Sequence, residues 1–290
     1  MNNPRSLNVI DDWKNRTCVL ATMHKKETVI SPLVGSELGI KVVVPEDFDT
    51  DRFGTFTKEI KRQGDQLHAA RAKAVAAMEH TGLDLAIASE GSFVSHPIVP
   101  FLSQNIELVL LLDKKNNIEI VGLYETTTAI PKGTYVSTPQ EAVDTAVSWG
   151  FPDQGVIIRP SRNARGQIYK NITTHHELYS ASKTLLSRWF KRKIFIETDM
   201  RAHRCAERMK SIKEATHRLI TNCKMGCPIC NAPGFVPTKS IPGLMCKSCK
   251  APTPLAKEIL TVCKICNHTQ HENLERLIEA DPENCRLCNP

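Results

Sequence analysis

A chain of 290 residues with 41% hydrophobic and 6% aromatic residues has the composition of a globular protein, with enough length for one large or two ordinary domains. No apolar run approaches the roughly eighteen residues that a membrane-spanning helix needs, and the first residues lack the apolar stretch of a secretory signal. We therefore expect a cytoplasmic protein with no membrane partner.

The formal net charge of +7 is concentrated near the end of the chain, where residues 201–290 carry 14 Lys and Arg against 8 Asp and Glu. If eight cysteine thiolates there hold two Zn²⁺ ions, each centre adds a charge of about −2, so the net charge of the protein falls to about +3. The charge alone is therefore weak support for binding nucleic acid.

Short apolar runs alternate with helical patterns from residue 17 to about 190, as in α/β folds. Strands are expected at 17–21, 40–45, 83–88, 155–160 and 193–198, with a hairpin over 106–125 around "KKNN". Helices are expected from Ser31-Pro32 to about Gly39, then at 65–82, 138–150, 174–190 and 199–222. Capping boxes at Thr138 with Glu141 and at Thr174 with Glu177 mark two of the helix starts.

These elements predict an α/β domain over residues 15–198, built on an open mixed sheet with flanking helices. A basic connecting helix at 199–222 leads to a tail at 223–290, which we expect to be a small zinc-ribbon-like module. The helix carries six Lys or Arg within 201–218, which could face nucleic-acid phosphates, although the solvated face of an amphipathic helix is the better interpretation.

The tail holds nine of the eleven cysteines, eight of them in four C-x-x-C pairs. Each such turn can direct two sulfurs at one point, so two turns complete a tetrahedral S₄ shell and eight thiolates match two structural zinc ions. The predicted metal ligands are Cys227, Cys230, Cys246, Cys249, Cys263, Cys266, Cys285 and Cys288. Sequential pairing of the turns would give two stacked ribbons and is slightly favoured; interleaved pairing, which would give one cross-braced module, stays open.

A second candidate site follows from "DLAIASEGSF", residues 84–93. If 83–88 is a parallel strand, Glu90 lies just past its carboxyl end, as "TMHKKE" (22–27) lies past the strand at 17–21. Ligands of open α/β sheets bind at such ends. Glu90 and Glu27 could therefore hold Mg²⁺ beside lysines that bind phosphate; as an alternative, Glu90 only caps a loop or pairs with a lysine.

The loop "FDTDRFGTFTKEIKR" (48–62) is rich in short oxygen side chains and could supply further metal or phosphate contacts, although it also suits a plain turn. Together these segments predict catalytic carboxylates at Glu90, Glu27, Asp49 and Asp51. The predicted phosphate-binding residues are Lys25, Lys26, Arg62, Arg71 and Lys73. The expected partner is a nucleotide-like small molecule, with nucleic acid less well supported.

The order of "ATMHKKE", "AARAKAVAAM", "DLAIASEGSF", "ELVLLLD" and "IYKNITTHHELYSASKTLL" resembles that of the inosine/xanthosine triphosphatase-like superfamily, over roughly residues 17–190. That resemblance implies Mg²⁺-dependent hydrolysis of non-canonical nucleoside triphosphates. A more specific resemblance is to an uncharacterised bacterial family known as a domain of unknown function. It rests on "DTDRFGTFTKEI" (49–60), "ASEGSF" with "HP" (88–97), "TDMRAH" (198–203) and the four knuckles ending "CNP", and it implies no activity.

The candidate residues and the superfamily resemblance lead to one expectation, a Mg²⁺-dependent phosphohydrolase or pyrophosphatase with a structural two-zinc tail. The alternative is a zinc-ribbon module that binds nucleic acid or protein and catalyses nothing.

Overall fold

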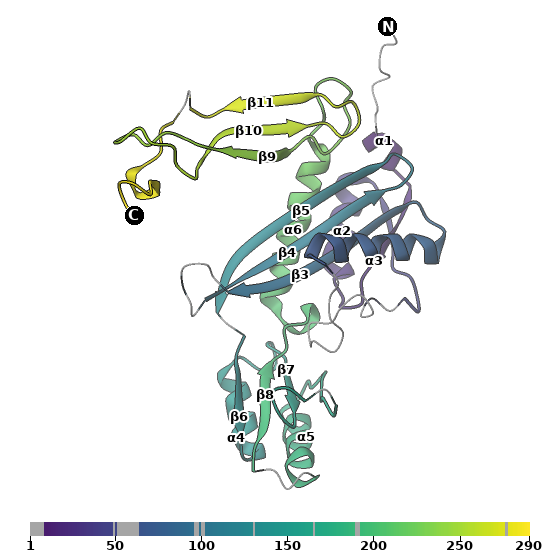
Figure 1. The fold of residues 1–290 in the computed structure, drawn as a ribbon. Helices are drawn as coiled ribbons and strands as arrows, with labels where there is room; N and C mark the ends of the chain where they lie inside the picture. Colours follow the sequence, from purple (N-terminus) through teal and green to yellow (C-terminus); the bar gives the residue numbers. More distant parts are fainter. Residues whose placement is uncertain are drawn as a thin grey trace.

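A computed structural model describes residues 9–48, 50, 64–95, 99, 102–129, 131–164, 166–188, 192–275 and 278–290. In this part of the chain, three sheets and six α-helices follow one another along the sequence (Figure 1). The expected combination of an open mixed sheet, flanking helices and a small cysteine-rich module is confirmed.

The first sheet has five strands in the order β2-β1-β3-β4-β5. Its strands are β1 (Thr17–Ala21), β2 (Lys41–Val43), β3 (Leu85–Ser95), β4 (Leu102–Asp113) and β5 (Ile118–Ala129). The strands β2, β1 and β3 are parallel, whereas β3, β4 and β5 form antiparallel ladders. The predicted hairpin around "KKNN" is confirmed, because residues 114–117 form the turn between β4 and β5.

Helices cover both faces of this sheet (Figure 1), and alternate residues of β3 pack on opposite sides of it. Leu85 and Ile87 pack with α1 (Val9–Trp13), α2 (Glu27–Leu38) and α6 (Ala206–Lys224). Ala86 and Ala88 pack instead against α3 (Gln66–Thr81). The helix α6 lies directly on the backbone of β5, because a Cβ at Gly122 would come within 2.2 Å of the Ala215 carbonyl oxygen.

The segment 15–198, expected as one α/β domain, contains two separate sheets. The second sheet has the order β6-β8-β7 and is antiparallel: β6 (Gly133–Val136), β7 (Val156–Arg159) and β8 (Ile194–Thr198). Its core packs with α4 (Pro139–Ser148) and α5 (His175–Arg188). Both predicted capping boxes are present: Glu141 N donates to Thr138 Oγ1 at 3.1 Å, and Glu177 N donates to Thr174 Oγ1 at 3.2 Å.

The helix at 199–222 is more than a connector. A short 3₁₀ turn at Ala202–Arg204 precedes α6, and α6 buries Ile212, Ala215, Leu219 and Ile220 in the core of the first sheet. Since its apolar face is inside the α/β domain, the chain returns from the second sheet to complete the core of the first.

The cysteine tail forms a third, antiparallel sheet in the order β11-β10-β9. Its strands are β9 (Pro237–Pro242), β10 (Ala256–Val262) and β11 (Thr269–Asn273), followed by a 3₁₀ turn at Pro282–Asn284. No helix in the described ranges is long and apolar enough to cross a membrane.

Among the boundaries that differ from expectation, two shape the candidate pocket. The helix α2 begins at Glu27 and contains Pro32, whereas a start at Ser31 was predicted. The strand β3 continues to Ser95, so Ser89 to Ser92 lie inside a strand and not in a loop beyond it. The antiparallel partner β4 holds β3 in strand conformation past the point where β1 ends.

Candidate functional site: two cysteine centres and a buried charged pocket

The four C-x-x-C turns share one backbone design. In each turn the amide four residues after the first cysteine donates to that cysteine's carbonyl oxygen, for example Asn231 N to Cys227 O at 2.8 Å and Asn267 N to Cys263 O at 2.9 Å. The residue after the second cysteine adopts positive φ at Asn231, Lys250 and Asn267. This design turns both sulfurs of each pair toward the same point.

The turns assemble into two four-cysteine groups, and within each group the sulfurs lie within 4.8 Å of one another. The groups pair the turns alternately: Cys227, Cys230, Cys263 and Cys266 in one, and Cys246, Cys249, Cys285 and Cys288 in the other. The slightly favoured sequential pairing is therefore wrong. Each strand between turns carries the chain from one end of the third sheet to the other, about 20 Å for a seven-residue strand, so consecutive turns lie at opposite ends.

The sulfur spacing suits a metal ion. Facing sulfurs in the first group are 3.7 Å (Cys227 and Cys266) and 3.6 Å (Cys230 and Cys263) apart. In the second group they are 3.9 Å (Cys246 and Cys288) and 3.5 Å (Cys249 and Cys285) apart. A tetrahedron with metal–sulfur bonds of about 2.3 Å has edges of about 3.8 Å, whereas a disulfide needs about 2.05 Å. Each of the two groups could therefore hold one metal ion.

The two centres differ in their surroundings. The first, which we call the proximal centre, packs with Phe235 and Ile265, and Ile265 also contacts the core beneath α6. The second, the distal centre, leaves Cys249 and Cys288 exposed. The proximal centre thus adjoins the α/β core through Ile265, while the distal centre lies at the far end of the third sheet.

A small pocket lies beside the carboxyl end of β1, where β3 extends beyond it. Its charged lining comes from four elements: Lys26 at the start of α2, Lys73 of α3, Glu90 of β3 and Arg208 of α6. Each of these side chains belongs to a residue that is less than a tenth exposed. The sequence-based proposal that Lys26, Lys73 and Glu90 meet at this place is therefore consistent with the geometry.

Two of the three cations are paired. Lys73 forms an ion pair with Glu90, and Arg208 Nε donates to Glu107 Oε1 at 2.7 Å. Lys26 forms no ion pair with a carboxylate among the described residues; its Nζ donates to Ser89 Oγ at 2.9 Å. Three buried cations line the pocket, and the described carboxylates that balance them are Glu90 in the lining and Glu107 behind Arg208, which leaves one surplus positive charge among these side chains.

Burial is the largest influence on the Lys26 amine and lowers its pKa to about 8. Arg208 and Lys73 lower the pKa further, whereas Glu107 and Glu90 raise it. The charged amine is therefore costly to maintain here, and a bound anion would stabilise it.

Other predicted site residues lie elsewhere. Lys25 is exposed, and Glu27, the first residue of α2, is partly exposed and outside the described lining of the pocket. Arg71 is turned toward β5, where its Nε donates to Glu119 Oε2 at 2.6 Å. The predictions for Asp49, Asp51 and Arg62 fall outside the described residues. Thr50, between the two aspartates in sequence, is buried and lines the pocket.

The sequence analysis missed Arg208 and Glu107, which are both buried. A pattern was available for Arg208: it lies at helical spacing from Ile212, Ala215 and Leu219, so it shares the apolar face of α6. The sequence indicated a site at Glu107 less clearly. It is a lone carboxylate in an apolar strand, and its burial is explained only by its partner, which the sequence does not reveal.

The D-M-R-A-H segment joins the second sheet to this pocket. Arg201 Nη2 donates to buried Asp199 Oδ2 at 2.6 Å, and the Arg208 guanidinium donates to the Met200 carbonyl oxygen. The rings of His203 and His24 stack with centroids 5.2 Å apart, and His24 lines the pocket. Burial, assisted by the neighbouring His24 and Arg201, lowers the pKa of His203 to about 4.

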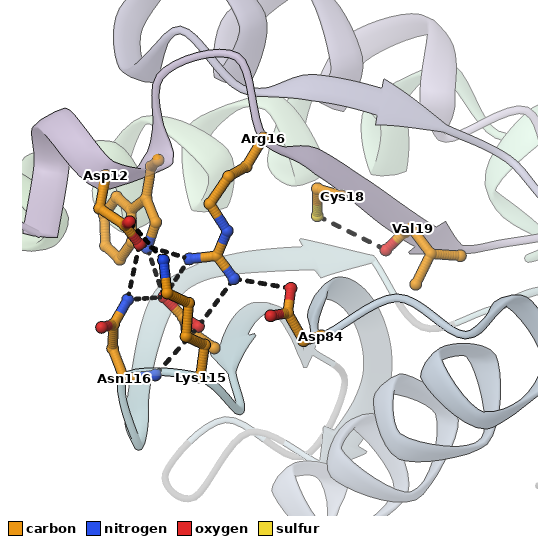
Figure 2. Close-up of polar contacts among 9 residues, drawn as sticks. Asp12, Arg16, Cys18, Val19, Asp84, Lys115 and Asn116 are labelled. Atoms are coloured by element: carbon orange, nitrogen blue, oxygen red, sulfur yellow. Dashed lines mark hydrogen bonds and ion pairs between the residues drawn. The ribbon is translucent and has the colours of Figure 1, made fainter.

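A separate charged network holds the opposite end of β1 (Figure 2). Asp113, at the end of β4, accepts hydrogen bonds from Arg16 Nη1 at 2.9 Å and from Trp13 Nε1 at 2.7 Å. Arg16 also donates to Asp84 and Asp12. The network joins α1 and β1 to the β4–β5 turn, so its role is to fix the sheet from which the pocket is built.

In a comparison with protein families, the family described as Domain of unknown function (DUF6671) matches residues 73–290. This range covers most of the chain, from Lys73 of the pocket through all four cysteine turns, and the chain belongs to this family. A search of curated proteins found no match.

Proposed function

Starting from a family that carries no assigned activity, we propose that this protein is a Mg²⁺-dependent phosphohydrolase or pyrophosphatase that acts on a nucleotide-like substrate. The observation that carries the proposal is the surplus buried cation at the end of β1. Lys26 lies there with Lys73 and Arg208, and only Glu90 and Glu107 balance them among the described residues. A phosphate group would supply the missing negative charge.

The position of the pocket supports a phosphate group. Its volume is only about 20 Å³, room for about one water molecule, so a single phosphate oxygen could enter while the rest of the substrate lies outside. The pocket also lies next to the first turn of α2, where the positive end of the helix dipole attracts anions.

Glu90 is the proposed magnesium ligand. Its carboxylate lies in the pocket beside Lys73, so a metal ion would have to compete with that lysine. Asp49 or Asp51, which flank Thr50 of the pocket lining in the sequence, would complete the proposed carboxylate set. A carboxylate-held Mg²⁺ would stabilise the negative charge that develops on phosphate oxygens during cleavage.

In the tail, we propose that zinc is the metal at both four-cysteine centres and that its role is structural. Four thiolates fill a tetrahedral shell and leave no position for water or substrate. The distances between the sulfurs match the edges of a tetrahedron built with zinc–thiolate bonds.

The test is a screen of common and non-canonical nucleoside triphosphates for release of phosphate or pyrophosphate, with and without Mg²⁺. We expect Mg²⁺-dependent turnover that falls at least 100-fold in Glu90→Gln. Glu79→Gln is the matched control, because Glu79 is an exposed carboxylate on the same helix as Lys73.

Thermal melting of each variant separates loss of chemistry from loss of folding. Because Glu90→Gln leaves Lys73 buried without its partner, the double variant Glu90→Gln, Lys73→Gln is measured beside it. Equal turnover in wild type and in a folded Glu90→Gln variant, or no turnover across the whole panel, would exclude the proposed function.

A further inference from the structure

Ser89 and Lys26 form a close contact inside the pocket. Lys26 Nζ lies 2.9 Å from Ser89 Oγ and 3.3 Å from the Ser89 carbonyl oxygen. Both residues are buried and both line the pocket. The two contacts to one residue fix the amine against the hydroxyl, which is the arrangement that a serine nucleophile and its base require.

The extended β3 strand is responsible for this contact. Beyond Ala88, β3 no longer pairs with β1, while Ser89 remains paired with Val109 of β4. The Ser89 side chain therefore lies next to the start of α2, where β1 would otherwise have continued. Neither residue was assigned this relationship by the sequence pattern, because 63 residues separate them.

We propose that Ser89 is a catalytic nucleophile and Lys26 its general base, so that the pocket transfers a phosphoryl-type group to Ser89 before water releases it. The transfer of a phosphoryl-type group from a nucleotide-like substrate rests on the proposed function. The pairing of Ser89 as nucleophile with Lys26 as base does not depend on it.

The two proposed steps need only the substrate and water. Neutral Lys26 Nζ takes the Ser89 hydroxyl proton as the Oγ–P bond forms, and the bond from phosphorus to the leaving group breaks, with the electron pair on the leaving oxygen. Lys26 then returns its proton to solvent. In the second step it takes a proton from water, which attacks phosphorus, and gives that proton to the departing Ser89 oxygen.

With no anion bound, burial makes the neutral Lys26 amine accessible near physiological pH. The charged groups that face it are Glu107 of β4, Glu90 of β3, Lys73 of α3 and Arg208 of α6, and burial lowers its pKa to about 8. Arg208 and Lys73 also place positive charge beside the phosphorus oxygens as they gain negative charge.

The experiment uses a small fluorophosphonate, which reacts at phosphorus with activated serines and releases fluoride. Intact-mass analysis and peptide mapping of the full-length protein should find one adduct on Ser89. We expect labelling to be lost in Ser89→Ala and to slow at least 100-fold in Lys26→Met, which removes the base but keeps most of the length of the side chain.

Ser92→Ala is the matched control. Ser92 lies on the same strand, and its hydroxyl donates to Gln66 Oε1 at 3.0 Å rather than contacting a lysine. This variant should label at the wild-type rate. A pH series on the wild-type protein adds a test that needs no variant: the labelling rate should rise about tenfold per pH unit below the Lys26 pKa and level off above it.

Labelling of other serines at the rate of Ser89, unchanged labelling in a folded Lys26→Met, or a rate that is flat between pH 6 and 9 would each overturn the proposal. Labelling of Ser89 without turnover of any nucleotide would reject the proposed function and leave the nucleophile intact. Nucleotide turnover without an adduct on Ser89 would support the proposed function, reject Ser89 as the nucleophile and indicate direct attack by water.

Discussion

Gly91 lies directly beneath the buried ion pair between Arg208 and Glu107. A Cβ at position 91 would come 2.0 Å from Arg208 Nη2 and 2.6 Å from Glu107 Oε2. The ion pair therefore requires a residue without a side chain at this point of β3, which accounts for the glycine in "ASEGSF".

Gly91→Ala should break this ion pair. Two buried charges would lose their alignment, and separating such a pair costs about 3 to 5 kcal/mol of unfolding free energy. Urea denaturation checks the value. Gly35→Ala in α2 is the matched control, because its Cβ would have no neighbour closer than 3.6 Å; it should be neutral or stabilise by about 0.5 to 1 kcal/mol. Equal stability of the two variants would contradict the role assigned to Gly91.

Asp113 should make stability depend on pH in the acid range. Burial raises its pKa, but hydrogen bonds from Arg16, Asn116 and Trp13 outweigh burial and lower the pKa below 3.8. Because the folded pKa is below the unfolded one, this carboxylate stabilises the fold above about pH 4, and the contribution is lost as pH falls through the folded pKa.

Asp113→Asn should therefore cost about 3 kcal/mol at pH 7 and progressively less as pH falls below 4, as measured by urea denaturation followed by tryptophan fluorescence. Asp84→Asn is the control, since the Asp84 side chain is 51% exposed and its pairing with Arg16 should contribute less than about 1 kcal/mol. A cost for Asp113→Asn that does not change with pH would show that packing, and not charge, is lost.

Metal analysis of the purified protein should give two zinc ions per chain. With both ions bound, only Cys18, Cys205 and Cys223 lie outside the centres, and all three are buried. Thiol titration of the folded protein should therefore find few reactive groups, rising toward eleven after denaturation with a chelator. Fewer than one zinc ion per chain would contradict the structural assignment.

Loss of the two centres should have unequal effects. Cys227→Ser disturbs the proximal centre, which packs with Ile265 into the core and follows directly after α6. Cys246→Ser disturbs the distal centre at the other end of the third sheet. We expect Cys227→Ser to lower the melting temperature and to speed hydrogen exchange in residues 206–224, and Cys246→Ser to leave that exchange unchanged.

Nucleotide turnover adds a further comparison between these two variants. If the proposed activity is present, it should survive Cys246→Ser, because the distal centre shares no described element with the pocket. Equal exchange in α6 for both variants would mean that the tail behaves as one unit.

The sequence by itself determined the local features. The capping boxes at Thr138 and Thr174, the "KKNN" turn and the end of α3 at Gly82 follow from interactions between residues close in the chain. The ligand identity of the eight cysteines is equally local, because each C-x-x-C turn brings its own two sulfurs together.

Only the tertiary structure decided how these pieces combine. Which cysteine turns meet depends on the alternating direction of β9, β10 and β11, and the length of β3 depends on its pairing with β4. The burial of Arg208 depends on Glu107, 101 residues away, and the contact of Lys26 with Ser89 depends on where β1 ends. A side-chain pattern records which residues are apolar or charged, but a buried charge is stable only beside its partner, and the fold alone supplies that partner.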